Sequence, residues 1–218
     1  MAGGIDTVIF DMDGVIFDSE TLVLSSWKEV ADRHGIKNVE EVCHECLGTN
    51  SVVSKQIFLR HYGKDFPYDE YKAEMAEVFF GYASDGRLAK KPGVEELLMY
   101  LKENGFKVGL ASSTQEATVR RQISEGGLLK YFDQIIGGDM VKRSKPEPDI
   151  FLEACKRLES EPERCYVIED SYNGIRAARA AGMHPIMVPD LMEPTEEMRG
   201  LAEKIFESLY DVMGYLNE

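Results

Sequence analysis

The 218-residue sequence contains no long hydrophobic run. A helix that crosses a membrane needs about 18 or more apolar residues in succession, and no such stretch occurs. Residues 1–6 also lack the basic cluster and the long apolar segment that together mark a secretory signal. These absences lead us to expect a cytoplasmic protein with no membrane partner.

Cysteine is also scarce, and the chain has four, at Cys43, Cys46, Cys155 and Cys165. They are too few and too scattered for a disulfide framework, which is typical of a reducing compartment. Cys43 and Cys46 have CxxC spacing, but a structural zinc site needs four ligands and the sequence has no second pair of this kind. We therefore interpret both as ordinary residues of a helix.

Positively charged residues are also few compared with negatively charged ones. The chain has 25 lysine and arginine residues against 39 aspartate and glutamate residues, giving a formal net charge of −14. Nucleic-acid binding needs a basic surface, so we expect no nucleic-acid partner. An anionic substrate would need positive charge concentrated locally by a metal ion, a few lysines or helix N-termini. The sequence contains no internal repeat. Its oligomeric state cannot be read from these patterns, and we expect a monomer by default.

The patterns that are present divide the chain into two parts. Over residues 91–218, strand patterns alternate with helix patterns, which predicts βαβ units and a parallel sheet. Residues 5–10 resemble another buried strand, whereas residues 16–90 contain helix patterns alone. We therefore predict an α/β protein with a Rossmann-like parallel-sheet core, residues 1–15 and 91–218, and an inserted all-helical cap domain, residues 16–90. A hinged helical domain beside an active site would serve as a lid that excludes water.

The individual elements follow from hydrophobic spacing and from the positions of glycine and proline. The later strands are expected at residues 107–111, 134–136, 165–168 and 185–188. The core helices are expected at residues 94–104, 116–125, 149–158 and 172–181, with two helical pieces over 195–216. The helices of the insertion are expected at residues 19–35, 39–48, 51–62 and 69–83. Their aromatic and methionine residues are interpreted as core packing.

Two carboxylates follow the first predicted strand. Val8, Ile9 and Phe10 are apolar at every position, as in a strand buried on both faces, and Asp11 and Asp13 come directly after them. In open α/β sheets, ligands bind just beyond the carboxyl ends of the strands. Two close carboxylates repel each other unless a cation or a shared proton compensates. A hard divalent ion such as Mg²⁺ is the simplest compensation, although such a sequence can also form a plain tight turn.

Other predicted strand ends also carry polar residues. Ser112 and Ser113 follow the strand at 107–111, and Glu169 and Asp170 follow the strand at 165–168, with Lys145 between them in the sequence. Each alone has an ordinary interpretation as a helix cap, a solvated lysine or a favourable charge at a helix N-terminus. Together they form a set that can hold a metal ion and an anion.

These residues give the sequence a recognisable pattern. Residues 11–15, Asp-Met-Asp-Gly-Val, resemble the first motif of the haloacid dehalogenase-like (HAD) hydrolase superfamily. Ser112 resembles the second motif, Lys145 the third and the Glu169–Asp170 pair the fourth. Residues 145–151 and 169–175 are similar to the β-phosphoglucomutase/phosphoglycolate phosphatase branch, which carries a helical cap between the first two motifs. The resemblance runs along essentially the whole chain and implies the HAD fold.

The resemblance implies a division of roles. Asp11 would attack phosphorus and form an aspartyl-phosphate, while Asp13 would protonate the leaving oxygen and later take a proton from water. Mg²⁺ would be held by the Asp11 carboxylate, the Asp13 backbone carbonyl and the Asp170 carboxylate, with Glu169 nearby or behind them.

The remaining motif residues would bind the phosphate or balance charge. Ser112 and the backbone N–H of Ser113 would hold phosphate oxygens. Lys145 would neutralise Asp11 and the transferring group. Gly14 would leave room for a close backbone approach.

A phosphatase acting on a small phosphorylated metabolite, such as a sugar phosphate, is the leading functional interpretation. A β-phosphoglucomutase-like phosphomutase is the alternative, but the mutases resembled here have a histidine where this chain has Val23 and a lysine where it has Gln115. Residues 47–52 also lack the arginine that helps bind a second phosphate. A non-catalytic phosphate-sensing module is a further alternative, but it would have no use for Asp13. Haloacid dehalogenation is disfavoured because it needs no Mg²⁺.

Overall fold

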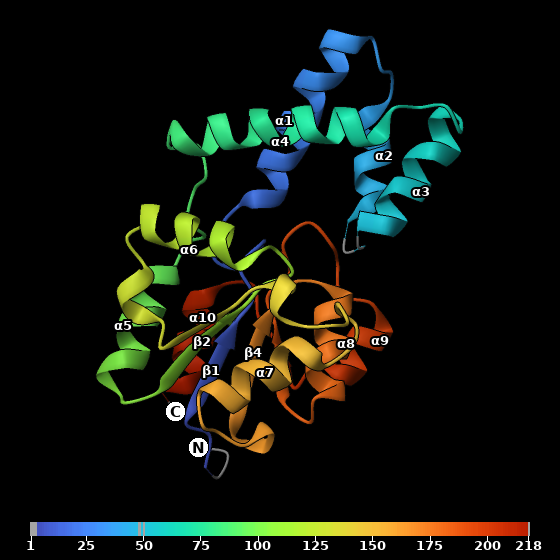
Figure 1. Ribbon diagram of the computed structural model, residues 1–218. Coiled ribbons are helices and arrows are strands. Elements are labelled where there is room, and N and C mark those ends of the chain that lie inside the picture. Colours follow the sequence, from blue (N-terminus) through green and yellow to red (C-terminus); the bar gives the residue numbers. More distant parts are fainter. Residues whose placement is uncertain (1–3, 48, 50, 218) are drawn as a thin grey trace. The chain divides into compact units, whose positions relative to one another are not determined.

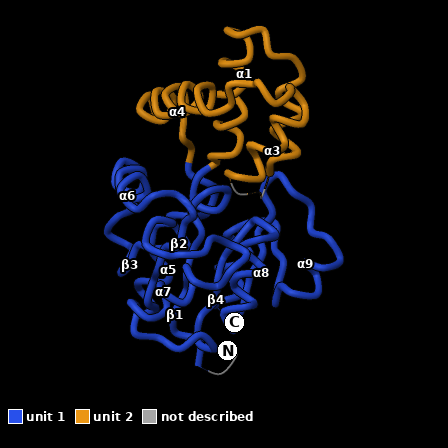
Figure 2. Tube along the Cα trace, turned by 45° about the vertical axis from the view of Figure 1, so that its right-hand side comes forward, with its two compact units in different colours: residues 1–17, 90–218 blue, residues 18–89 orange. Residues whose placement is uncertain are grey.

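The computed structural model describes residues 4–47, 49 and 51–217. The chain forms two compact units (Figure 2). Unit 1 contains the residues up to Phe17 and from Lys90 onward, and unit 2 is the segment Asp18–Ala89 between them. These limits differ by one or two residues from the boundaries expected from the sequence. The reason is Phe17, which forms isolated β-bridges with Asp13 and Lys90 and so ties both connecting segments to unit 1.

Unit 1 is built on a parallel sheet, as the alternating pattern predicted. Its strand order is β3-β2-β1-β4-β5-β6, and every described pair of neighbouring strands is parallel. β1 lies between β2, the next strand along the chain, and β4, which comes later in the sequence. In open α/β sheets, ligands bind beyond the carboxyl ends of the strands at such a position. The strands are β1 Thr7–Phe10, β2 Lys107–Ala111, β3 Gln134–Ile136, β4 Cys165–Glu169, β5 His184–Met187 and β6 Lys204–Ile205.

Helices cover the sheet of unit 1. α7 and α8 lie in front of it in the view of Figure 1, and α10 lies behind it. Ile9 of β1, Phe151 of α7 and Val167 of β4 belong to one buried cluster between the sheet and these front helices. Burial of Val8, Ile9 and Phe10 explains why β1 is apolar at every position. The helices are α5 Val94–Glu103, α6 Glu116–Glu125, α7 Asp149–Arg157, α8 Tyr172–Ala180, α9 Glu196–Leu201 and α10 Leu209–Leu216.

Unit 2 consists of four helices with a core of their own. They are α1 Ser19–His34, α2 Val39–Cys46, α3 Ser51–Tyr62 and α4 Tyr68–Ser84. Trp27, Phe58 and Tyr68 are buried together, with the Trp27 and Phe58 ring centroids 4.6 Å apart. The interpretation of these aromatic residues as core packing is confirmed. Among the described residues, no helix combines the length and the apolar character needed to cross a membrane.

Candidate active site

Asp11 leaves the sheet at the carboxyl end of β1. Its backbone N–H donates to the carbonyl of Ile168 in β4, which extends the parallel pairing by one residue and fixes where the side chain starts. Ser112 follows β2 on one side of β1, and Asp170 follows β4 on the other. The structure therefore brings three of the sequence motifs to neighbouring strand ends.

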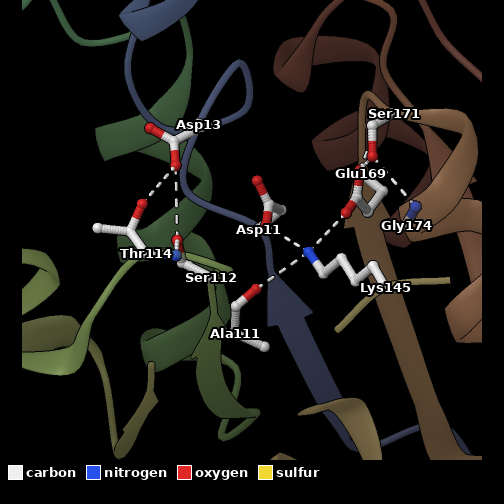
Figure 3. A network of polar contacts seen from close by, with 9 residues as sticks. All are labelled: Asp11, Asp13, Ala111, Ser112, Thr114, Lys145, Glu169, Ser171 and Gly174. Atoms are coloured by element: carbon white, nitrogen blue, oxygen red, sulfur yellow. Dashed lines mark hydrogen bonds and ion pairs between the residues drawn. The ribbon is translucent and has the colours of Figure 1, made fainter. Parts of the chain in front are cut away.

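Lys145 lies between β3 and α7 and is buried beside Asp11. Its Nζ donates to Asp11 Oδ1 at 2.5 Å, to Glu169 Oε1 at 2.7 Å and to the carbonyl of Ala111 at 3.3 Å. Figure 3 shows the ammonium between the two carboxylates. An ammonium has three donors, so these contacts account for all of them. Lys145 is thereby held in one position by groups from β1, β2 and β4.

Burial and neighbouring charges shift the pKa values of Asp11 and Lys145. Burial raises the pKa of Asp11 to about 8; Lys145 opposes this rise, whereas the negative charges of Glu169 and Asp13 add to it. Burial lowers the pKa of Lys145, but the Asp11 and Glu169 carboxylates outweigh burial and raise it above its ordinary value. One lysine therefore does not balance the negative charge gathered here, and a bound cation would lower the pKa of Asp11.

Three buried carboxylates form a cluster that could hold a metal ion. One oxygen from each of Asp11, Glu169 and Asp170 lies within 4.8 Å of the others. Carboxylate oxygens suit a hard divalent cation such as Mg²⁺ or Ca²⁺. Glu169 also accepts hydrogen bonds from the Ser171 N–H at 2.8 Å and the Ser171 hydroxyl at 2.9 Å, in addition to the Lys145 bond. These bonds orient Glu169, as outer groups around a metal site commonly orient its ligands.

Glycines make room for the two carboxylates from β4. Gly14 has φ +76°, and a Cβ at this position would lie 2.3 Å from Asp170 Oδ2. At Gly174, in the first turn of α8, a Cβ would lie 1.7 Å from Glu169 Oε1. Both contacts are far too short for two non-bonded atoms, so neither carboxylate could keep its place beside a larger residue. The need for a close approach at Gly14 was expected from the sequence, whereas the need at Gly174 was not.

Asp13 faces a different set of groups. Ser112 Oγ lies 3.5 Å and Thr114 Oγ1 3.3 Å from Asp13 Oδ2, on the β2 side of Asp11 (Figure 3). The Thr114 N–H donates to Ser112 Oγ at 3.1 Å, which fixes the turn after β2. The Asp13 carboxylate is not among the three carboxylates that cluster. Its expected metal contact, through the backbone carbonyl, stays a prediction, as does phosphate binding by the exposed Ser113.

Sequence reasoning missed several residues of this network. Thr114 was passed over because a hydroxyl in a polar run after a strand has no distinguishing pattern. Ser171 and Gly174 lie within residues 169–175, but the resemblance of this stretch to the family implies no role for either. The spacing of a serine cap and a glycine three residues later could have indicated a tight strand-to-helix turn, since the Ser171 hydroxyl accepts from the Gly174 N–H.

A comparison with known families decides the classification. The model of the haloacid dehalogenase-like hydrolase family matches residues 8–188. The chain belongs to this family of enzymes. The family assignment made from the motifs is therefore confirmed, and the matched region runs from β1 through the whole acidic cluster.

The relatives of this chain include named phosphatases and solved structures. The phosphorylated carbohydrates phosphatase of Thermotoga maritima is 33% identical, over 83% of each sequence. The bifunctional riboflavin kinase/FMN phosphatase of Arabidopsis thaliana is 32% identical over 94% of the chain, but the chain spans 54% of the length of that relative. The crystal structure of β-phosphoglucomutase from Clostridium difficile is 26% identical, with a TM-score of 0.78 over 98% of this chain and 96% of that one.

Proposed function

We propose that this protein is a Mg²⁺-dependent phosphatase that hydrolyses a small phosphorylated metabolite through an aspartyl-phosphate. The observation that carries the proposal is that two carboxylates only two residues apart in the sequence have different surroundings. Asp11 is buried against Lys145 and the acidic cluster, whereas Asp13 is held by Ser112 and Thr114. A nucleophile and a proton carrier need such different surroundings. The names of the phosphatases among the relatives support the same activity.

Asp11 acts as the nucleophile. Its carboxylate oxygen forms a bond to phosphorus while the bond from phosphorus to the leaving oxygen breaks, which divides one difficult displacement into two easier steps. Lys145 stays beside Asp11 and offsets negative charge that would otherwise repel a phosphate. A buried position limits the access of competing water to the reacting atoms.

Asp13 moves the proton in both steps. It gives a proton to the leaving oxygen in the first step and takes one from the attacking water in the second. The second step breaks the bond between Asp11 and phosphorus and releases inorganic phosphate, so both aspartates return to their starting states. Hydroxyl contacts from Ser112 and Thr114 hold the Asp13 carboxylate on one side of Asp11.

The residues present fit a magnesium ion. Asp11 and Asp170 would bind it with their carboxylates, Asp13 would contribute its backbone carbonyl, and Glu169 would support them. When bound, the ion would neutralise charge on the phosphate and on Asp11. The Ser112 hydroxyl and the Ser113 N–H would hold phosphate oxygens beside Gly14. A net charge of −14 agrees with a small-molecule substrate rather than a nucleic acid, and we propose that the protein acts as a monomer.

A phosphomutase is the second candidate, favoured by the likeness to β-phosphoglucomutase. A mutase returns the phosphoryl group on the aspartate to a sugar and must hold both phosphates of a bisphosphate intermediate. Gln115 precedes α6 and is exposed, at the position where the mutases carry a lysine. Val23 in α1 has no charge either. The chain thus lacks cations at these two positions, which supports water as the final acceptor.

The Asp11→Asn variant tests the proposal. An amide cannot attack phosphorus, so turnover of a generic aryl phosphate should fall by roughly 10⁴-fold or more, as for other catalytic nucleophiles. The exposed Asp32→Asn, the same chemical change, serves as control and should keep full activity. Free phosphate and the 6-phosphate isomer are both measured with a sugar 1-phosphate as substrate. Activity retained by a folded Asp11→Asn would refute the nucleophile, and isomer formed without free phosphate would establish the mutase.

A further inference from the structure

Two segments that follow neighbouring strands of unit 1 pack on each other. Residues 112–115 form the turn after β2, here called the β2 turn, and residues 137–145 form the segment after β3, here called the β3 segment. The β2 turn supplies the Ser112 and Thr114 hydroxyls that contact Asp13 (Figure 3). The proposed reaction therefore requires this turn to keep its place, and contacts from the β3 segment hold it.

The backbones of the two segments are in direct contact. The Gly138 N–H donates to the Thr114 carbonyl at 2.8 Å. A Cβ at Gly138 would lie 2.2 Å from the Ser113 carbonyl oxygen. A Cβ at Gly137 would lie 2.2 Å from the backbone nitrogen of Glu116. Non-bonded atoms do not approach so closely, so glycine at both positions lets the β3 segment reach the β2 turn.

Asp139 adds a hydrogen bond from a side chain. Its Oδ1 accepts from the Glu116 N–H at 2.8 Å. Glu116 is the first residue of α6, and the first N–H groups of a helix have no acceptor within the helix. Gln115, which precedes α6, makes no capping hydrogen bond with its side chain. Asp139 therefore caps α6 from a separate segment, and its negative charge suits the positive end of the helix.

The position of Asp139 is itself fixed. It lies in a single 3₁₀ turn, Gly138–Met140, where the Met140 N–H donates to the Gly137 carbonyl at 3.0 Å. The Met140 side chain packs against the buried cluster that contains Phe151. The carboxylate that caps α6 is thus carried by a turn anchored to the core of unit 1.

Lys145, at the other end of the β3 segment, holds the opposite side of the β2 turn. Its Nζ donates to the carbonyl of Ala111, the last residue of β2, at 3.3 Å (Figure 3). One continuous segment therefore contacts the β2 turn before, within and after its four residues. Loss of the Asp139 contact would release the side of the turn that leads into α6, which is the side where Thr114 lies.

We propose that Asp139 is a positioning residue that holds the β2 turn in place for phosphate binding and proton transfer. Through the Glu116 N–H it fixes the start of α6, and with it the place of Thr114 beside Asp13. Asp139 acts through the backbone and takes no direct part in the chemistry. The inference rests on the proposed function, because this turn matters for the reaction only if Asp13 moves the proton and Ser112 holds phosphate.

The Asp139→Ala variant removes the acceptor, and Asp133→Ala is the matched control. Asp133 Oδ2 also accepts one backbone N–H at 2.8 Å, that of Val108 near the amino end of β2. Its exposed ion pair with Lys102 adds little to stability. Both variants should melt about 2–4 °C below the wild type, as for the loss of one hydrogen bond in a chain of this size.

Only Asp139→Ala should lose activity. Its kcat for an aryl phosphate should fall by about tenfold or more, since misplacement of a group by about 1 Å can cost about 10²-fold. The inhibition constant of inorganic phosphate should rise by about fivefold, the effect of losing about one hydrogen bond. In Asp133→Ala, both quantities should equal those of the wild type.

Two further variants test whether the hydrogen bond is the cause. Asp139→Asn keeps an oxygen acceptor and should retain kcat within about threefold of the wild type, because asparagine caps helices as well as aspartate does. Glu116→Pro removes the donor instead. Proline suits the first position of a helix, and the extended Gln115 suits the position before a proline. Glu116→Pro should reproduce the loss of kcat, and it replaces Asp139→Ala if that variant does not fold.

Amide hydrogen exchange reports on the β2 turn without any turnover. The Thr114 N–H, which donates to Ser112 Oγ, should exchange about fivefold faster or more in Asp139→Ala and at the wild-type rate in Asp133→Ala. Absence of turnover in the wild type would refute the proposed function, and the exchange rates would then decide by themselves whether Asp139 holds the turn. In an active protein, the positioning role is wrong if Asp139→Ala keeps the wild-type kcat, if Asp133→Ala loses as much, or if Asp139→Asn is equally impaired.

Discussion

Gly14 and Asp170 follow two neighbouring strands, and they come close because Gly14 has no side chain. Gly14 follows β1 and has φ +76°, and a Cβ there would lie 2.3 Å from Asp170 Oδ2. Asp170 is one of the three carboxylates of the acidic cluster. A side chain at position 14 would therefore move Asp170 away from Asp11, and the cluster would lose one of its oxygens.

Gly14→Ala should separate this effect from ordinary backbone strain. Gly105 has the same φ of +76° and nothing within 4 Å of its Cβ position, so Gly105→Ala is a matched control. Both variants should lose about 1–2 kcal/mol of stability, because a left-handed conformation is unfavourable for alanine. Gly14→Ala should lose more than Gly105→Ala, because its Cβ also meets Asp170. Turnover of an aryl phosphate should fall, and the half-saturating Mg²⁺ concentration rise, in Gly14→Ala alone. Equal activity and equal Mg²⁺ dependence in the two variants would show that Asp170 does not need this space.

Among the secondary-structure elements, the connection from β4 to α8 links several residues of the site. Glu169 ends β4, holds Lys145 with one oxygen and accepts from the backbone and hydroxyl of Ser171 with the other. The Ser171 hydroxyl then caps α8 by accepting from the Gly174 N–H. Strand end, lysine and helix start are thus joined through one carboxylate, so a change in the first turn of α8 should reach Lys145.

Gly174→Ala tests this connection. Its Cβ would lie 1.7 Å from Glu169 Oε1, so overpacking should destabilise the protein by about 1–3 kcal/mol and reduce activity. Gly81→Ala, within α4, is the control, because its Cβ would meet nothing within 4 Å. That variant should gain about 0.5–1 kcal/mol, since alanine is the better helix former. Thermal unfolding and aryl phosphate turnover measure both effects, and a Gly174→Ala protein as stable and active as Gly81→Ala would contradict the role of the connection.

The elements also show how far sequence reasoning reaches. β1, β2 and β4 were predicted from short apolar runs, and the helices of unit 2 from apolar residues that recur at helical spacing. β6 was missed, because two residues, Lys204 and Ile205, carry no period and form a strand only beside β5. Lys145 was recognised from its motif, but its three partners come from strands whose order no local pattern specifies. The contact of Thr114 with Asp13 depends on side-chain packing, which a sequence read residue by residue does not reveal.

At the scale of the whole molecule, the acidic cluster makes stability depend on pH. The folded-state pKa of Asp11, about 8, lies above its ordinary value of 3.8, so the folded protein keeps a proton that the unfolded chain releases. The stability contributed by this proton is complete below pH 3.8 and is lost as the pH rises toward about 8. Ion pairs lower the pKa values of the half-buried Glu74 and the exposed Glu197, and these groups act in the opposite direction at acidic pH. Between about pH 5 and 8, the change in the free energy of unfolding with pH should therefore come mainly from Asp11.

Removal of metal ions should expose this dependence. In EDTA, the free energy of unfolding should fall between about pH 5 and 8, by at most about 1.4 kcal/mol per pH unit from Asp11. Asp11→Asn should flatten the profile, because an amide does not titrate, whereas Asp32→Asn should retain the wild-type slope. Chemical denaturation at a series of pH values measures all three proteins. A slope in Asp11→Asn equal to that of the wild type would assign the effect to other groups.

Mg²⁺ should reverse the loss, because an ion that binds only the folded state stabilises it by mass action. At pH 8, EDTA should abolish aryl phosphate turnover, and excess Mg²⁺ should restore both turnover and melting temperature. Asp170→Asn should need more Mg²⁺ for both, since one carboxylate of the cluster is then neutral. The two readouts must move together if one ion serves stability and catalysis. A Mg²⁺ effect on melting temperature that persists unchanged in Asp170→Asn would place the ion elsewhere on this acidic protein.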